Sequence, residues 1–275
     1  MRRQAATGIP YCWRAEALYR PGVVDDFFLL HQPQSTEALC AEMAPLAYAE
    51  FGTVLEPALA RAGFGLAAAP FEQGGTQAFL AENGQQAVLV FRGSDDVLDW
   101  QNNLNAMPVR WRGAGEVHGG FQESLEAVWP AVAVALGSVR LPLIITGHSL
   151  GGALACMAAS LVPHERWITF GAPKPGDAVF CESAGDGMRF VNNEDVVCWL
   201  PLDVFPLSGV YRHAGTPYLI GPNGGIHKGV DPAALDRPLM TLRRLHRLVA
   251  ETDSLSRLPR FLMDHAPINY LSALR

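Results

Sequence analysis

The sequence predicts an α/β protein with a mostly parallel central sheet and helices on both of its faces. Short apolar runs typical of buried strands alternate with longer segments of helical periodicity along most of the chain. Glycine and proline mark many of the boundaries between these segments. Strands that alternate with helices in this way pair in parallel, because each helix carries the chain back across one face of the sheet.

The length and composition fit a single folded domain over residues 1–275, in which residues 1–70 form an N-terminal helical and strand lead-in. Apolar residues make up 49% of the chain and charged residues 17%, which excludes a disordered chain. The formal net charge is -6. Since binding to nucleic-acid phosphates needs clustered lysine and arginine, we expect no nucleic-acid partner.

A β-hairpin is expected where Thr76–Glu82 and Gln85–Arg92 flank Asn83-Gly84. Both turn residues tolerate a positive φ, and the second arm contains the apolar run Ala87–Phe91 that reads as a buried strand.

The remaining elements follow from hydrophobic periodicity and from glycine and proline signals. The expected helices span Thr36–Phe51, Phe121–Leu136, Ser149–Leu161 and Leu239–Val249, and the expected strands span Leu141–Thr146, Trp167–Phe170, Met188–Val191 and Tyr218–Ile220. Ser35 or Thr36 is a plausible cap of the first helix, and Pro130 is expected to kink or split the second. The arginines of the last helix indicate a solvated face.

Cysteine usage gives no sign of a metal site or a disulfide framework. The five cysteines are widely spaced and none forms a CxxC pair; they are Cys12, Cys40, Cys156, Cys181 and Cys198. Cys156 lies in an apolar helical segment, where we expect it to act as a small buried apolar side chain. No HExxH motif is present, so we expect no metal and no cofactor.

The N-terminus carries no recognisable targeting signal. Arg2 and Arg3 are not followed by an apolar stretch before Glu16 and Arg20, so we expect no secretory signal peptide. The chain also has no run of about eighteen uncharged apolar residues, so we expect no transmembrane segment. These observations favour a cytoplasmic protein, or one exported by a route without an N-terminal signal.

The motif that carries chemistry is Gly147-His148-Ser149-Leu150-Gly151, a G-x-S-x-G pattern between a predicted buried strand and an alanine-rich helix. In this context the serine occupies a sharp, strained turn at the carboxyl edge of the sheet, and the glycines leave room for that turn. The first N–H groups of the helix face the site, so Leu150 is a candidate oxyanion donor through its N–H. His148 is expected to point away from the site.

Three segments together resemble the class 3 lipase family, which includes the fungal triacylglycerol lipases. They are GHSLGGALA at residues 147–155, FRGS at residues 91–94, and the Asp-His pair at residues 264–265. The resemblance covers roughly Ala87 to Tyr270. It implies an α/β-hydrolase fold with a short helical lid, and hydrolysis of acylglycerol or other carboxylic esters without a cofactor.

Ser149 needs a base to take its proton and an acid to orient that base, and in α/β-hydrolases these follow in the order serine, acid, histidine. The histidines far enough downstream of Ser149 are His213, His227, His246 and His265. His265 matches the terminal histidine of the family and is followed by a tyrosine. His118 precedes the nucleophile, so it fails the order rule and is expected to serve packing or hydrogen bonding.

The acid is expected just past the strand that ends near Val191. Asp195 matches the family pattern N-x-x-D-x-V, and Glu194 and Asp203 are the alternatives. Asp264 adjoins the candidate histidine in sequence, but neighbouring side chains rarely orient one another's rings, so a structural role is expected. The resemblance also assigns the second oxyanion donor to Ser94, through its N–H and its hydroxyl.

Residues 94–108 are the candidate lid. Val97, Trp100 and Leu104 fall on one face of a short helix, which by itself indicates ordinary core, but the segment aligns with the lipase lid. A lid of this kind implies transient contact with a lipid interface. Acidic residues at its start disfavour anionic lipids. A second apolar segment, Trp199–Leu207, either lines an acyl pocket or is core.

The sequence therefore predicts a lipase-like serine ester hydrolase that forms an acyl-enzyme. The alternatives are a carboxylesterase or feruloyl-type esterase of the same family, and a non-catalytic binding protein on the same fold. The presence of a candidate residue for every catalytic role argues against the binding protein.

Overall fold

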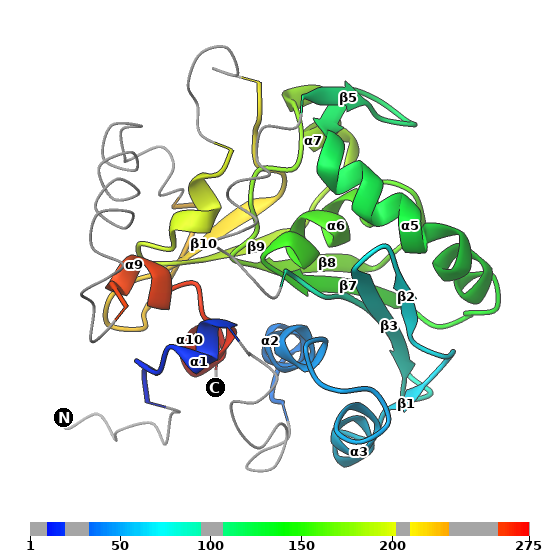
Figure 1. Cartoon of the computed structure of the whole chain (residues 1–275), viewed down its shortest axis with the longest axis horizontal. Helices are drawn as coiled ribbons and strands as arrows, with labels where there is room; N and C mark the ends of the chain where they lie inside the picture. Colours follow the sequence, from blue (N-terminus) through cyan, green and yellow to red (C-terminus); the bar gives the residue numbers. More distant parts are fainter. Residues whose placement is uncertain (1–9, 20–32, 95–106, 202–209, 231–257, 275) are drawn as a thin grey trace.

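A computed structural model describes residues 10–19, 33–94, 107–201, 210–230 and 258–274. Its centre is a nine-stranded sheet in the order β1-β3-β4-β7-β8-β9-β10-β11, with β2 added beside β3 (Figure 1). The strands are β1 (Gly65–Leu66), β2 (Phe71–Gln73), β3 (Thr76–Glu82), β4 (Ala87–Phe91), β7 (Leu143–His148), β8 (Arg166–Phe170), β9 (Met188–Asn192), β10 (Thr216–Ile220) and β11 (Ile226–Lys228). The five strands β4, β7, β8, β9 and β10 pair in parallel. The antiparallel strands β3 and β11 flank them on the two sides.

Helices cover both faces of the sheet, which confirms the predicted α/β class. The helices are α1 (Glu16–Tyr19), α2 (Thr36–Leu46), α3 (Leu55–Arg61), α5 (Gly119–Leu136), α6 (Leu150–Ala159), α7 (Ala178–Ser183), the short 3-10 helix η2 (Val196–Trp199), α9 (Arg260–Met263) and α10 (Pro267–Leu274). Figure 1 shows α5 and α6 on one face, and α2 and α10 on the other. No helix in the described ranges has the length and apolar character needed to cross a bilayer.

Each face of the sheet has its own apolar core because successive strand residues point to opposite sides. In β4, Leu89 and Phe91 join the core that contains α5 and α6, whereas Val88 and Val90 join the core that contains α2. Every residue of this strand is buried, which explains why its sequence is continuously apolar rather than alternating.

Helix α5 presents one apolar stripe to the core on its side of the sheet. Phe121, Leu125, Val128 and Val132 of α5 recur at intervals of three or four residues and are all buried. The helix stays continuous through Pro130, so it is not split there. Pro130 is solvent-exposed, so its ring does not disturb the packed stripe.

Two predicted boundaries are wrong for local reasons. The predicted helix over residues 36–51 ends at Leu46, one residue after Pro45. Its cap is Ser35, whose hydroxyl accepts from the Ala38 N–H at 3.1 Å. The second hairpin arm begins at Ala87 rather than Gln85, because a four-residue loop joins β3 and β4.

The loop at residues 83–86 is held by a side chain. The Asn83 carboxamide oxygen accepts from the N–H groups of Gln85 and Gln86, each at 3.0 Å. Gly84 supplies the positive φ, +79°, that the loop needs. The Asn-Gly pair therefore marks a hairpin as predicted, but the asparagine closes a longer loop than a two-residue turn.

Several short elements have no counterpart in the predicted pattern. The edge strands β1, β2 and β11 have two or three residues, and so do β5 (Pro108–Arg110) and β6 (Glu116–His118), which pair as a separate ribbon. Elements this short carry no measurable periodicity, so only their pairing in the folded chain reveals them.

The parallel strands bring three segments of the site to one edge of the sheet. The FRGS segment follows β4, the Gly-x-Ser-x-Gly turn follows β7, and Asp195 follows β9, all at carboxyl ends of strands. Ligand sites of open α/β sheets form at this edge. The segment between α9 and α10 supplies His265 to the same edge.

Trp167 in β8 provides a test of the packing that holds these strands together. Its buried indole packs against Gly187 and Gly215, and a Cβ on Gly187 would collide with the ring. We therefore expect Gly187→Ala to lower the free energy of unfolding by about 1–3 kcal/mol. Urea unfolding followed by tryptophan fluorescence measures this.

Gly65→Ala is the matched control, because a Cβ added to Gly65 would meet no heavy atom within 4 Å and the backbone there has no positive φ. Equal stability of the two variants would contradict the close packing of Trp167 on Gly187.

Candidate active site

Ser149 occupies a strained turn between β7 and α6. Its φ is +59° and its ψ is -130°, a conformation that non-glycine residues rarely adopt. Its N–H donates to the carbonyl of Phe170 at 2.9 Å, which ties the turn to the neighbouring strand β8. The hydroxyl group is thereby held at the carboxyl edge of the sheet, where the sequence motif predicts it.

The two flanking glycines are required by close packing. A Cβ on Gly147 would collide with the backbone of Gly151, and a Cβ on Gly151 would collide with the backbone of Phe91 in β4. Neither glycine has a positive φ, so the reason for glycine here is space rather than backbone freedom. The turn fits only because strand, helix and neighbouring strand approach one another without side chains.

His265 lies between α9 and α10 and points its imidazole at Ser149. Its Nε2 is 3.0 Å from the Ser149 hydroxyl oxygen, and both residues are buried. The two residues are 116 positions apart in the chain. An imidazole at this distance can accept the serine proton as the hydroxyl attacks an electrophile.

Asp195 completes the arrangement on the other side of the imidazole. Its carboxylate oxygens lie 2.8 Å and 3.0 Å from His265 Nδ1. The same carboxylate accepts from the Val197 N–H at 2.9 Å, as the N-cap of η2, and from the Tyr270 hydroxyl at 2.6 Å. These two donors fix the orientation of the carboxylate toward the imidazole.

Tyr270, in α10, is a site residue whose contact with the acid the sequence does not predict. Burial, and then the neighbouring Asp195 charge, raise the pKa of Tyr270 well above its usual range, so its hydroxyl stays protonated and donates. The hydroxyl oxygen in turn accepts from the Asn192 N–H at 3.0 Å. The only signal in the sequence is a tyrosine that closely follows His265.

The other candidate histidines lie elsewhere. His213 is partly buried and its Nε2 contacts the carbonyl of Cys198 at 2.7 Å, while His227 is exposed in β11. His246 lies outside the described residues. His118 is the N-cap residue of α5, and its ring stacks on Phe121 with a centroid distance of 4.1 Å.

Among the described residues, Asp195 supplies the carboxylate that lies at hydrogen-bonding distance from His265 Nδ1, and Asp264 bonds other groups. The Asp264 carboxylate accepts from the Tyr11 hydroxyl at 2.8 Å, from Asn193 Nδ2 at 2.9 Å and from the Glu194 N–H at 3.2 Å. It thus ties the histidine segment to the N-terminal segment and to the loop after β9, in line with the structural role expected for it. Asp203 lies outside the described residues.

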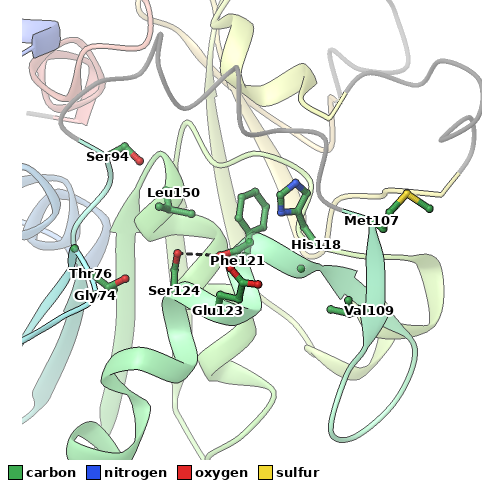
Figure 2. A pocket seen from close by; sticks show the side chains of 13 residues that line it. Gly74, Thr76, Ser94, Met107, Val109, His118, Phe121, Glu123, Ser124 and Leu150 are labelled. Atoms are coloured by element: carbon green, nitrogen blue, oxygen red, sulfur yellow. Dashed lines mark hydrogen bonds between the residues drawn. The ribbon is translucent and has the colours of Figure 1, made fainter.

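Ser94 and Leu150 both line a cavity of about 650 Å³ and lie near each other in Figure 2. Leu150 is the first residue of α6, where backbone N–H groups have no partner within the helix. The loop that carries Ser94 lies beside the turn at Ser149, since a Cβ on Gly93 would be 3.0 Å from the Ser149 Cβ. Both candidate donors therefore flank the nucleophile turn.

The cavity wall combines apolar and polar groups, as Figure 2 shows. Met107, Val109, Phe121 and Leu150 supply apolar surface, and Thr76, Glu123 and Ser124 supply polar groups. Met107 is 65% exposed at the rim. A cavity of this size and composition accommodates a substrate with an apolar chain and a polar end.

The candidate lid, residues 94–108, lies mostly outside the described residues, and so do its predicted substrate contacts Val97, Trp100 and Leu104. The second apolar segment, Trp199–Leu207, is described only as far as Pro201. Trp199 and Leu200 are buried there and do not line the cavity beside Ser94. In the described ranges no group of three or more histidine, cysteine or acidic side chains is arranged to hold a metal ion.

The prediction that His148 points away from the site is only half correct. Its side chain does not reach the Ser149 hydroxyl, but its Nε2 lies 2.7 Å from the carbonyl oxygen of His265, and the two ring centroids are 4.5 Å apart. Nothing in the sequence signals this contact, because the residues are 117 positions apart.

A family model described as Lipase (class 3) matches residues 88–205 of this chain. A secreted mono- and diacylglycerol lipase of Fusarium solani is 31% identical over 162 residues, which cover 52% of this chain and 47% of that protein. A lipase of Rhizomucor miehei is 32% identical over 170 residues, which cover 54% of this chain and 46% of that protein. The chain thus spans about half the length of either relative.

Solved structures extend the likeness to the fold. A deletion mutant of the Rhizomucor miehei lipase in complex with its propeptide has a TM-score of 0.53 and 26% identity, over 62% of this chain and 59% of that chain. A mutant MDLA from Penicillium cyclopium has a TM-score of 0.59 over 92% of this chain and 94% of that chain; its identity is 20%, so it supports the fold alone. The chain has the α/β-hydrolase fold, and its residues 88–205 are similar to the class 3 lipase family.

Proposed function

We propose that this protein is a lipase-like serine ester hydrolase with Ser149 as nucleophile, His265 as general base and Asp195 as the acid that orients it. The observation that carries the proposal is the buried chain of hydrogen bonds from Asp195 through His265 to Ser149. Side chains from three distant parts of the sequence meet in the order acid, imidazole, hydroxyl. The alternative of a binding protein without chemistry gives no reason for this order.

In the proposed reaction, His265 Nε2 takes the proton of Ser149 as the hydroxyl oxygen attacks the carbonyl carbon of an ester. The tetrahedral intermediate collapses, the alcohol leaves with the proton from the imidazole, and an acyl-enzyme remains. Water then attacks the acyl group, again with His265 as base, and releases the carboxylic acid. The Asp195 carboxylate holds the imidazole with Nδ1 protonated and stabilises the imidazolium.

The oxyanion of the intermediate needs hydrogen-bond donors at the position where its charge develops. We assign these to the N–H of Leu150 and to the N–H and hydroxyl of Ser94. Both residues border the cavity next to Ser149. The dipole of α6 adds a partial positive charge at the same place.

Acylglycerols are the first proposed substrate class, and contact with a lipid interface goes with them. The two relatives described above are named as a mono- and diacylglycerol lipase and a lipase. The exposed Met107 at the rim of the cavity offers an apolar contact to such an interface.

A carboxylesterase or feruloyl-type esterase is the second candidate. The polar groups of Thr76, Glu123 and Ser124 in the cavity wall favour it, because a purely apolar acyl chain leaves these groups without a partner from the substrate.

We expect Ser149→Ala to lower the hydrolysis of p-nitrophenyl esters by about 10³-fold to 10⁶-fold and to abolish labelling by a fluorescent fluorophosphonate, because no nucleophile remains. Ser138→Ala is the control, since Ser138 is exposed and its hydroxyl bonds only the nearby Ala135 carbonyl in the described contacts. Full activity or labelling in Ser149→Ala would refute the assignment.

We expect Asp195→Asn to lower kcat by about 10⁴-fold with the fold intact, because an amide no longer holds the imidazole in the productive tautomer. Steady-state kinetics with a soluble ester and a circular dichroism spectrum measure the two effects. Asp186→Asn, at an exposed position, is the matched control and should leave kcat unchanged. A fall of less than about tenfold would place the orienting acid elsewhere.

The two substrate classes are separated by the rate on tributyrin measured across its solubility limit, beside a panel of p-nitrophenyl esters of increasing acyl length. A lipase gains rate when the emulsion forms, because the interface binds its apolar rim. A smooth saturation curve, with preference for short or aromatic acyl groups, would instead assign the esterase activity.

A further inference from the structure

Two polar side chains next to the proposed triad, one buried and one partly buried, have no part in the proton transfer described above. His148, the residue before the nucleophile, is 1% exposed and its Nε2 lies 2.7 Å from the carbonyl oxygen of His265. Its Nδ1 lies 3.0 Å from the hydroxyl oxygen of Tyr48, a partly buried residue just past α2. His148 thus joins a residue at position 48 to one at position 265.

The direction of each hydrogen bond follows from the chemistry of the groups. A carbonyl oxygen only accepts, so the bond to His265 requires the proton on His148 Nε2. Burial, and then the neighbouring His265, lower the pKa of His148 well below its usual range, so the ring is neutral and its Nδ1 accepts. Burial raises the pKa of Tyr48, so its hydroxyl stays protonated and donates to that nitrogen.

The Tyr48 hydroxyl also contacts the loop that carries the proposed oxyanion donor. A Cβ on Gly93 would collide with that hydroxyl and lie 2.7 Å from the His148 carbonyl oxygen, so Tyr48 and His148 both pack directly against the Gly93 backbone. The guanidinium of Arg92 lies 5.6 Å from the centroid of the Tyr48 ring, which gives the tyrosine a second contact with the same loop.

We propose that Tyr48 and His148 are positioning residues, which hold the backbone of His265 and the Gly93–Ser94 segment in register with Ser149. The inference rests on the proposed function, because it assigns these two residues to the alignment of that site. Hydrogen bonds run from Tyr48 to His148 and from His148 to the His265 carbonyl, and Gly93 packs against the Tyr48 hydroxyl.

Packing alone does not account for this pair. Two polar side chains in a core need every hydrogen bond satisfied, and apolar residues of similar size fill such space at less cost. At one end, His148 bonds the backbone carbonyl of His265, the proposed base. At the other end, Tyr48 packs against Gly93, which precedes the proposed oxyanion donor Ser94. Since a displacement of about 1 Å at a reacting group lowers the rate by about 10²-fold, an anchor on the backbone of His265 has a direct effect on kcat.

The first test uses substitutions that cut the chain of bonds at different points. Tyr48→Phe removes the donor to His148, and we expect kcat to fall about tenfold to hundredfold with KM changed less than about threefold. His148→Asn keeps an acceptor near Nδ1 but loses the bond to His265, so we expect a similar fall. His148→Gln places an amide N–H near Nε2 and keeps the bond to His265, but it loses the acceptor for Tyr48, so we expect a fall in kcat that is smaller than that of His148→Asn.

The double variant Tyr48→Phe/His148→Asn distinguishes one chain from two independent effects. Because both substitutions interrupt the same chain, we expect the double variant to lose no more than about the larger single effect. Every rate is divided by the number of serines that the fluorophosphonate labels to completion, so misfolded protein does not count. Tyr218→Phe is the control, since the Tyr218 ring packs on Phe190 away from this chain, and it should leave kcat unchanged.

The second test is measured on the wild-type protein, so its result does not depend on whether a variant folds. In ¹⁵N spectra of the wild-type imidazoles at neutral pH, we expect His148 to be neutral, with the proton on Nε2 and an unprotonated Nδ1; the His148→Gln variant assigns the signals. A protonated Nδ1 would overturn the inference, because Tyr48 then cannot donate to it.

The outcomes separate this inference from the proposed function. A wild-type protein without ester turnover or labelling would overturn the proposed function. If the wild type is active, any one of three results would overturn the positioning role alone. The kcat of Tyr48→Phe could equal that of Tyr218→Phe, or the kcat of His148→Gln could be no higher than that of His148→Asn. The third result is a double variant in which the two single losses of kcat multiply.

Discussion

The close approach of three backbones at Ser149 is the constraint on which the rest of the site depends. β7, α6 and the end of β4 meet where Gly147 and Gly151 leave no room for a side chain. This crowding holds Ser149 at a φ of +59°, a conformation that costs about 1–3 kcal/mol and persists only because the surrounding packing determines it. The strain places a hydroxyl above the sheet edge and directs the first N–H groups of α6 to the same point.

The proposed acid, Asp195, and the proposed base, His265, are held at this point by buried polar contacts. Asp195 is held by a tyrosine hydroxyl and a backbone N–H, and the segment of His265 is tied to the loop after β9 by Asp264. Within the described residues, these groups lie in surroundings of low polarity, where each hydrogen bond is strong and each missing partner costs more than in water. The same surroundings strengthen the attraction between the acid and the imidazolium that forms during the proposed reaction.

The site therefore combines a rigid half and an assembled half. The half formed by Ser149 and Leu150 belongs to one strand–turn–helix unit, and its geometry follows from local packing. The other half comes from loops after β4, after β9 and before α10, whose relative positions depend on side chains such as Tyr270 and, in our inference, on Tyr48 and His148. Errors of about an ångström in the assembled half affect the rate more than the stability, since proton transfer and oxyanion binding depend steeply on distance.

The sequence alone determined the features that are local or periodic: the α/β class, the buried strands of the parallel sheet, a helix cap at Ser35 or Thr36 and the turn at Ser149. It also indicated Asp195 and His265, through the order of the motif and the resemblance to a family. Only the tertiary structure decided the contacts of Tyr270, Asp264, Tyr48 and His148, the four-residue loop after β3, and the strands of two or three residues. The physical reason is that local patterns record which face of an element is buried, whereas a hydrogen bond between residues 100 positions apart leaves no local pattern.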